Sequence, residues 1–181
     1  QNSQLLKSIS LSTIDEILTQ VENSKIYRPT LFDFLAHNAL DFYETGESLN
    51  LKPRLTFEIK DPKYFDDFEN IQLASLDSLS PTYHALIIYK SLSSFHKGDK
   101  DPSAFLSNEI DRLQFVVDKG IIDNGQELHK TALKKLKTLF AKYPASTLVD
   151  FQVASIVDSE GKGFNPKTNR VNQFKRGDAL I

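Results

Sequence analysis

Four polar residues recur at helical spacing in an otherwise apolar stretch of the sequence, Arg28 to Gly46. Asp33, His37, Asp41 and Glu44 stand at positions i, i+4, i+8 and i+11, so a helix would place them in one row. A histidine with a carboxylate one turn before it and one turn after it suits a general acid or an oriented metal ligand, because both neighbours favour its charged form. The same row would also make a narrow polar stripe that faces water along a largely buried helix.

The sequence favours the polar stripe, a structural feature, over a catalytic or metal site. A metal site needs ligands that converge from a second element, and no residue elsewhere stands out as that partner. His84, His96 and His129 are isolated on separate expected helices, where a solvated or hydrogen-bonded ring is the default. Neither an H-E-x-x-H nor a G-x-S-x-G motif occurs. We therefore expect no catalytic residue, no metal and no cofactor.

Helices are the elements that would position this row. Pro29, Pro81 and Pro102 each open an apolar periodic run, as proline does in a first helical turn. Ser80 and Asp101 are suitable N-caps for the last two runs. The periodic runs predict helices at about the following ranges: Thr13–Asn23, Pro29–Thr45, Pro81–Lys97, Pro102–Lys119, Gly125–Lys142, Thr147–Asp158 and from Arg170 onward.

A connector of about Leu49–Leu79 separates the early helices from the later ones and is long for a compact domain. Its one strand-like run, Arg54–Ile59, alternates Leu55, Phe57 and Ile59, and would form an edge strand or a short extended segment lying in a groove. A single strand has no pairing partner, so we predict an all-α fold. Short loops between the other helices predict stacked antiparallel helix hairpins, an α-α superhelix.

One part of the chain resembles a tetratricopeptide repeat. Ala132, Leu136, Leu139 and Pro144 match the second helix of that repeat and the proline that ends it, and Ala154 falls where the next helix requires a small residue. We therefore expect a single helical-repeat domain over residues 1–181. Its first helices would lie in 1–46, the extended connector in 47–79 and the remaining hairpins in 80–181.

Composition narrows the classes of function. The formal net charge of −2 provides no dense basic face for nucleic acid. No apolar run approaches the roughly 18 residues of a membrane span. The absence of cysteine removes disulfides, thiolate nucleophiles and cysteine-ligated zinc. Since the chain has no methionine, we interpret it as a segment of a longer protein.

Lysines gather on the helix expected at about Gly125–Lys142. Lys130, Lys134 and Lys137 share one face of that helix, with Lys135 and Lys142 beside them. This basic stripe would be the solvated face of the helix, or else a docking surface for an acidic partner.

Two longer runs resemble a protein family. "RPTLFDFLAHNALDFY", from Arg28, and "YHALIIYKSLSSFHKGDKDPSAFLSNEIDRLQFV", from Tyr83, are similar to the N-terminal helical region of large alpha-2-macroglobulin-like proteins of Bacteroidetes-type bacteria. The resemblance extends over about Tyr27 to Asp158 and includes an "RL" helix at Arg112–Leu113. It implies a cell-envelope location, periplasmic or associated with the outer membrane, in a parent whose wider family traps proteases.

The trapping machinery of that family does not map onto this chain, which has no cysteine for a thioester and no pattern of β-sandwich strands. The resemblance therefore implies a non-catalytic interaction or scaffold module with protein partners, either other domains of the parent or an envelope protein. The alternative is a glycan- or peptide-capturing helical-repeat module of an outer-membrane uptake system. That alternative would bring these tyrosines into one concave patch: Tyr27, Tyr43, Tyr64, Tyr83 and Tyr89.

Overall fold

The computed structural model describes residues 2–18, 24–45, 57–66, 68–75 and 79–162. Within these ranges the prediction of an all-α fold of antiparallel helix pairs is confirmed, and no strand occurs. The long helices are α3 (Leu31–Glu44), α4 (Pro81–His96), α5 (Ser103–Lys119), α6 (Gly125–Phe140) and α7 (Ser146–Lys162). The short helices are α1 (Asn2–Ser8), α2 (Ser24–Tyr27) and the 3₁₀ helices η1 (Leu11–Ile17), η2 (Pro62–Phe65) and η3 (Phe68–Asn70).

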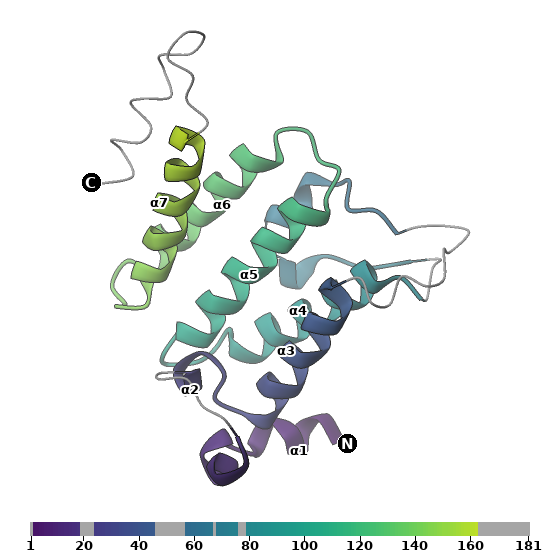
Figure 1. The fold of residues 1–181 in the computed structure, drawn as a ribbon, viewed down its shortest axis with the longest axis vertical. Helices are drawn as coiled ribbons and strands as arrows, with labels where there is room; N and C mark the ends of the chain where they lie inside the picture. Colours follow the sequence, from purple (N-terminus) through teal and green to yellow (C-terminus); the bar gives the residue numbers. More distant parts are fainter. Residues whose placement is uncertain (1, 19–23, 46–56, 67, 76–78, 163–181) are drawn as a thin grey trace, which may run out of the picture.

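Each long helix packs against the next one in the chain, from α3 to α7 (Figure 1). Helix α5 lies in the middle, with α6 and α7 on one side and α4 and α3 on the other (Figure 1). The short α1 contacts α3, and α2 contacts α5. No helix in these described ranges has a stretch both long and apolar enough to cross a bilayer.

The core lies on the inward faces of the long helices. Helix α5 contributes much of it, because Leu106, Leu113 and Val116 are almost completely inaccessible to solvent. Burying a side chain of this kind contributes about 1.5–3 kcal/mol of transfer free energy. The central place of α5 in the array follows from this apolar face, which contacts α4 on one side and α6 on the other.

The expected starts of the long helices are correct for α4 and α6 and are displaced by one or two residues for α3, α5 and α7. Ser80 caps α4 by accepting a hydrogen bond from the backbone N–H of Tyr83. Helix α3 begins two residues after Pro29, because Thr30 is its N-cap and forms a capping box with Asp33. Helix α5 begins after Pro102, and Asp101 does not stand at the N-cap; its carboxylate accepts the N–H and the hydroxyl of Ser103.

The helix predicted near Thr13–Asn23 is wrong where the structure describes it. This region forms the 3₁₀ helix η1, interrupted by a non-helical backbone at Ile14. The carbonyl of Ser10 accepts hydrogen bonds from both the N–H and the hydroxyl of Thr13, and this tight turn replaces the expected α-helical turn. Residues 19–23, and the helix predicted from Arg170, lie outside the described residues.

Residues 57–66 and 68–75, here called the covering segment, pack across the helices and complete the core. Helix η2 contacts α5 and α6, and η3 contacts α4. Ile59, Phe65 and Phe68 are buried, and the carbonyl of Ile59 accepts a hydrogen bond from the N–H of Ile121 at 2.8 Å. Residues 57–60 form no strand, while residues 54–56 of the strand-like run lie outside the described residues. The connector therefore enters the domain as an irregular segment packed on its helices.

Candidate functional site

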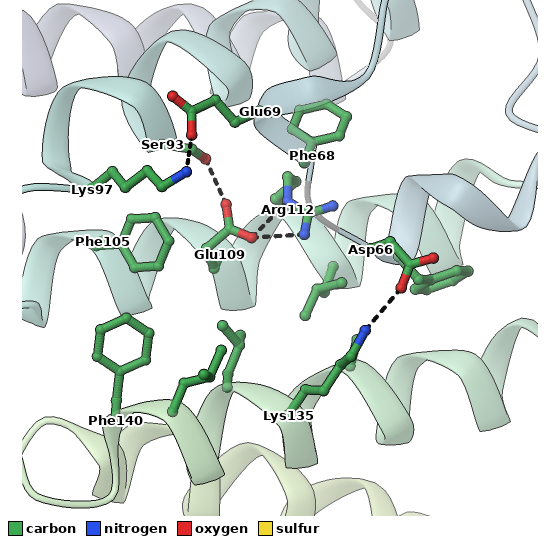
Figure 2. A pocket seen from close by; sticks show the side chains of 15 residues that line it. Asp66, Phe68, Glu69, Ser93, Lys97, Phe105, Glu109, Arg112, Lys135 and Phe140 are labelled. Carbon is green, nitrogen blue, oxygen red and sulfur yellow. Dashed lines mark hydrogen bonds and ion pairs between the residues drawn. The ribbon is translucent and has the colours of Figure 1, made fainter.

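A pocket of about 400 Å³ opens between the covering segment and helices α4, α5 and α6 (Figure 2). Its volume falls in the range of roughly 300–1,000 Å³ that is typical of ligand sites. The covering segment provides one wall, with Phe65 and Phe68, and the helices provide the other, with Phe105 and Phe140. Figure 2 shows Phe68 across the pocket from Phe105 and Phe140. Leu139 also lines the pocket and is 70% exposed.

Aromatic contacts fix the two walls. The guanidinium of Arg112 lies 4.6 Å from the ring centre of Phe68, a cation–π contact that joins α5 to η3. The ring centres of Phe105 and Phe140 are 5.6 Å apart, which joins α5 to α6. On the covering segment, Asp61 caps η2 by accepting the N–H of Lys63 at 2.9 Å and so positions the turn that carries Phe65.

Six charged side chains line the pocket, and each forms an ion pair with another of the six. Lys97 of α4 pairs with Glu69 of η3, and Lys135 of α6 pairs with Asp66 at 3.1 Å. These two pairs connect the helices to the covering segment at the pocket. The third pair, Glu109 and Arg112, lies on α5. The lining charges therefore sum to zero, and each is balanced by a direct neighbour.

The Glu109–Arg112 pair is buried and fully engaged. One carboxylate oxygen of Glu109 accepts hydrogen bonds from Nε and Nη2 of Arg112 at 3.1 and 2.7 Å, and the other accepts the hydroxyl of Ser93 at 2.5 Å. The guanidinium also donates through Nη1 to the carbonyl of Tyr64 at 2.5 Å. A buried charge is stable only when it is paired and hydrogen-bonded in this way. Glu109 is thus held in place by bonds to both of its carboxylate oxygens.

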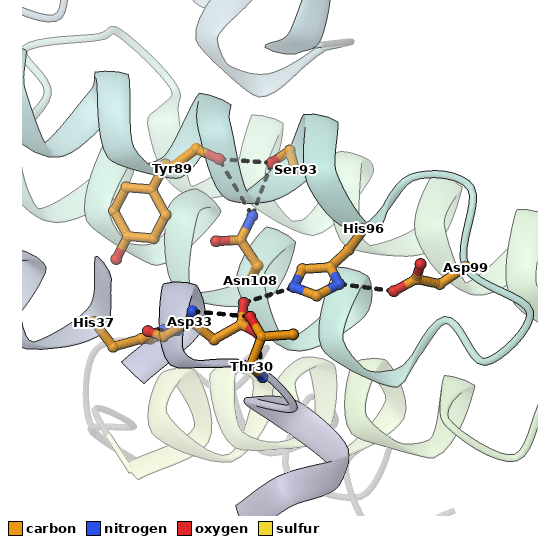
Figure 3. Close-up of polar contacts among 8 residues, drawn as sticks. All are labelled: Thr30, Asp33, His37, Tyr89, Ser93, His96, Asp99 and Asn108. Carbon is orange, nitrogen blue, oxygen red and sulfur yellow. Dashed lines mark hydrogen bonds and ion pairs between the residues drawn. The ribbon is translucent and has the colours of Figure 1, made fainter. Parts of the chain in front are cut away.

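The hydrogen-bond network around Glu109 extends between α4 and α5. Asn108 donates from Nδ2 to the hydroxyl oxygen of Ser93 at 2.8 Å, and Ser93 also lies 2.9 Å from the carbonyl of Tyr89 (Figure 3). The Oδ1 atom of Asn108 is buried and has no hydrogen-bond partner among the described residues. These hydrogen bonds therefore connect Glu109, which lines the pocket, to the contact between α4 and α5.

None of the four residues of the row predicted from the sequence lines the pocket. Figure 3 shows Asp33 and His37 on α3, with Asp33 facing His96 of α4. The exposure expected of this row is wrong for Asp33, which is 0% exposed, and for His37, which is also buried. Asp33 is buried because Oδ1 lies 2.7 Å from Nε2 of His96, while Oδ2 accepts the N–H and hydroxyl of Thr30. The second nitrogen of His96 lies 2.7 Å from the carboxylate of Asp99.

These contacts shift both pKa values of the Asp33–His96 pair. Burial raises the pKa of Asp33, but the hydrogen bonds from His96 and Thr30 outweigh it, so the pKa lies below its ordinary value. Burial lowers the pKa of His96, but the bonds to Asp33 and Asp99 outweigh it, so this pKa is raised. Both ring nitrogens of His96 face carboxylates and therefore donate, which makes the ring an imidazolium.

The other members of the row have separate partners. His37 donates from Nδ1 to the backbone carbonyl of Asp33 at 2.8 Å, and burial lowers its pKa. Asp41 is exposed, and Glu44 accepts the hydroxyl of Tyr89 at 2.7 Å. Among the described residues, no three histidine or acidic side chains are grouped so that they could hold a metal ion. The structure therefore does not bring the four residues together as one site.

His129 differs from the default expected for an isolated histidine. It lies on α6 in the interior, and neither ring nitrogen has a hydrogen-bond partner among the described residues. Burial lowers its pKa to about 4, so the ring is neutral near pH 7. A neutral buried imidazole without a partner is a source of instability.

Much of the basic stripe on α6 is neutralised by acidic residues of the chain itself. Lys130 pairs with Glu127 and Glu160 at 2.7 and 2.9 Å, and Lys137 pairs with Asp150. Such pairing weakens the attraction of this face for an acidic partner.

Only two of the five tyrosines named above lie around a common ring. Tyr43 stacks on His84 with ring centres 5.3 Å apart, and Tyr83 makes an edge contact with the same His84 ring, with centres 5.8 Å apart. Tyr89 is buried in the core, and Tyr64 lies against Phe68 of the covering segment.

Sequence reasoning missed the polar residues beneath the pocket. Glu109 and Arg112 stand at positions i and i+3 and interrupt the apolar row of α5, and this spacing was the one available signal. No feature of the sequence marked Ser93 as a member of this polar group. No family model matches the chain, and no curated protein or solved structure is significantly similar to it.

Proposed function

We propose that the chain is a non-catalytic interaction module, one helical part of a longer bacterial alpha-2-macroglobulin-like envelope protein, located in the periplasm or at the outer membrane. Its partner is a protein, either another domain of the parent or a second envelope protein. The observation that supports binding is the pocket, whose walls are apolar and whose six charges are all paired with one another. The runs from Arg28 and Tyr83 support the parent family by resemblance.

The state of the polar groups at the pocket favours binding over catalysis. A nucleophile needs an adjacent base, and a base needs a free lone pair within reach of the substrate. Both carboxylate oxygens of Glu109 already accept hydrogen bonds, one of them from Ser93. Lys97 and Lys135 are held in ion pairs at the pocket. Such a site excludes water from an apolar group of a partner, as the centre of a protein interface does.

The parent is tested by the size and cell fraction of the native polypeptide that carries this sequence. An antibody raised against the segment should detect a chain many times larger than 20.5 kDa in the envelope fraction. A native chain close to 20.5 kDa would rule out the parent proposed here.

Protein contact through the pocket is tested with two matched variants of the native polypeptide. Leu139→Glu places a charge at the pocket, while Phe151→Glu places one on α7 at a residue of similar exposure, 73% against 70%. The first variant should reduce cross-linking to the partner domain or envelope protein, and the second should not. Equal cross-linking in both variants would show that contact is made elsewhere.

One observation favours the second candidate, a module that captures glycans. Tyr43, His84, Tyr83 and Phe57 form a continuous row of half-buried rings, with Phe57 and Tyr83 centred 5.4 Å apart. Aromatic faces of this kind can stack on sugar rings. Calorimetry with neutral oligosaccharides should then detect binding that Tyr43→Ala weakens, and the absence of binding would remove this candidate.

A further inference from the structure

We propose that the pocket binds aromatic side chains of an irregular segment of a partner protein, in the same way as the covering segment binds to the helices. This inference rests on the proposed function, because it specifies which chemistry of partner the interaction module accepts.

The covering segment already demonstrates how these helices bind an irregular segment that contains two short 3₁₀ helices, η2 and η3. It inserts two phenylalanine side chains three residues apart, Phe65 and Phe68, and both are buried. Its backbone carbonyls are bound by basic side chains of the helices: Tyr64 by Arg112 of α5, and Ile71 by Lys90 of α4. Side chains in pockets give such recognition its specificity, and main-chain hydrogen bonds add affinity.

The pocket continues this intramolecular interface. The same two rings, Phe65 and Phe68, line it on the side of the covering segment, and Phe105 and Phe140 line it on the side of the helices. An aromatic side chain that enters between the walls would meet ring faces or edges on both sides, the arrangement that aromatic pairs prefer. The pocket is therefore the next position for an aromatic anchor along a surface that already holds two.

The charges around the pocket require an anchor that is uncharged. Every charged side chain of the lining is balanced by a neighbour, so a charged anchor would lose its hydration and find no counter-ion.

The 181-residue chain contains no tryptophan, so a single introduced tryptophan is a specific reporter. Leu139→Trp places it at the pocket, and Phe151→Trp is the matched control on α7. Both original side chains are largely exposed, so neither variant disturbs the core. The probe is a capped, uncharged serine–asparagine peptide with two phenylalanines three residues apart, the spacing of Phe65 and Phe68. Matched peptides carry glutamate, lysine or serine in place of phenylalanine.

Titration with the phenylalanine peptide should shift the emission of the Leu139→Trp variant and leave the Phe151→Trp variant unchanged. Affinity should fall by at least about tenfold for the glutamate, lysine and serine peptides, because the buried aromatic area is lost. The proposal is overturned if both reporters respond alike, if the charged peptides bind equally well, or if no peptide binds. A response to the neutral dye N-phenyl-1-naphthylamine without any response to peptides would also overturn it and would indicate a small-molecule site.

Failure of this inference can be distinguished from failure of the proposed function. If the native chain is long and envelope-located but no peptide binds, the partner makes contact at another surface. If the native chain is close to 20.5 kDa and the peptide binds, the parent is wrong and the chemistry of the pocket stands.

Discussion

Asp33 and His96 are 63 residues apart in the sequence, yet Oδ1 of the first lies 2.7 Å from Nε2 of the second in the interior. Both side chains are at most 2% exposed. The contact joins the start of α3 to the end of α4, so it fixes how these two helices pair. Removing one member of a buried ion pair leaves the other uncompensated and typically costs about 3–5 kcal/mol.

This pair should make the stability of the chain depend on pH in both directions. The pKa of Asp33 is lowered by folding, so its contribution is present above the ordinary value of 3.8 and is lost as pH falls through the folded value. The pKa of His96 is raised by folding, so its contribution is complete below 6.5 and is lost as pH rises through the folded value. The contribution of the pair to the free energy of unfolding should therefore be greatest between about 3.8 and 6.5.

Urea unfolding across this pH range measures the effect. Asp33→Asn keeps the shape of the side chain but removes the charge, and should flatten the pH dependence. If the stability of the Asp33→Asn variant depends on pH as strongly as that of the unsubstituted chain, another group is responsible.

Breaking the Glu109–Arg112 ion pair at the pocket should lower the free energy of unfolding more than replacing both of its members by apolar residues. Glu109→Gln leaves the guanidinium of Arg112 buried without a counter-charge, and should lower the free energy of unfolding by about 3–5 kcal/mol. Replacing both members, Glu109→Leu with Arg112→Met, should recover much of that loss. Lys135→Gln is the control, because it breaks an exposed ion pair and should change stability little. Chemical denaturation compares the three variants with the unsubstituted chain. A Glu109→Gln variant as stable as the unsubstituted chain would contradict this account.

Replacing His129 by leucine should stabilise the chain. The substitution removes two buried nitrogens that lack partners, and a gain of about 1 kcal/mol is expected near pH 7. The gain should increase on acidification from 6.5 to about 4, because the unfolded chain binds a proton at His129 in that range and the folded chain does not. Thermal unfolding at neutral and acidic pH measures both effects. A less stable variant would mean that the imidazole has a partner, such as a buried water.

Gly120 should tolerate no side chain. A Cβ atom added there would lie 2.4 Å from the backbone oxygen of Val116, and 3.5 Å from that of Ile59. Gly120→Ala should therefore lower the free energy of unfolding by about 1–3 kcal/mol. Gly98→Ala is the matched control, since nothing lies within 4 Å of its added Cβ. Equal melting temperatures for the two variants would show that the chain after α5 can adjust.

Periodicity predicted the long helices well but left their orientation open. The pattern around Asp33 showed that polar residues share a row, yet it did not show that His96 would face that row from α4. The exposed side of α3 instead carries Leu35 and Phe42. A helical pattern reports which residues share a face, whereas the neighbour that covers the face depends on tertiary packing.

The pocket could not be predicted because its walls come from distant parts of the chain. Phe65, Phe105 and Phe140 meet only after three elements pack together, and no spacing in the sequence relates them. The prediction of a helix near Thr13–Asn23 was wrong for a different reason. The hydrogen bonds between Ser10 and Thr13 compete with the helical pattern, and such local competition is not visible in hydrophobic periodicity.

The covering segment also sets the order in which the molecule can form. The helices from α4 to α7 follow one another through short loops, whereas the bond from Arg112 to the carbonyl of Tyr64 closes a separation of 48 residues. Contacts between distant residues form more slowly, because a longer loop must be closed first. The pairs among α4 to α7 are therefore expected to form early and the pocket late. Under the function proposed above, a chain whose helices have formed but whose covering segment is still free would lack the binding pocket.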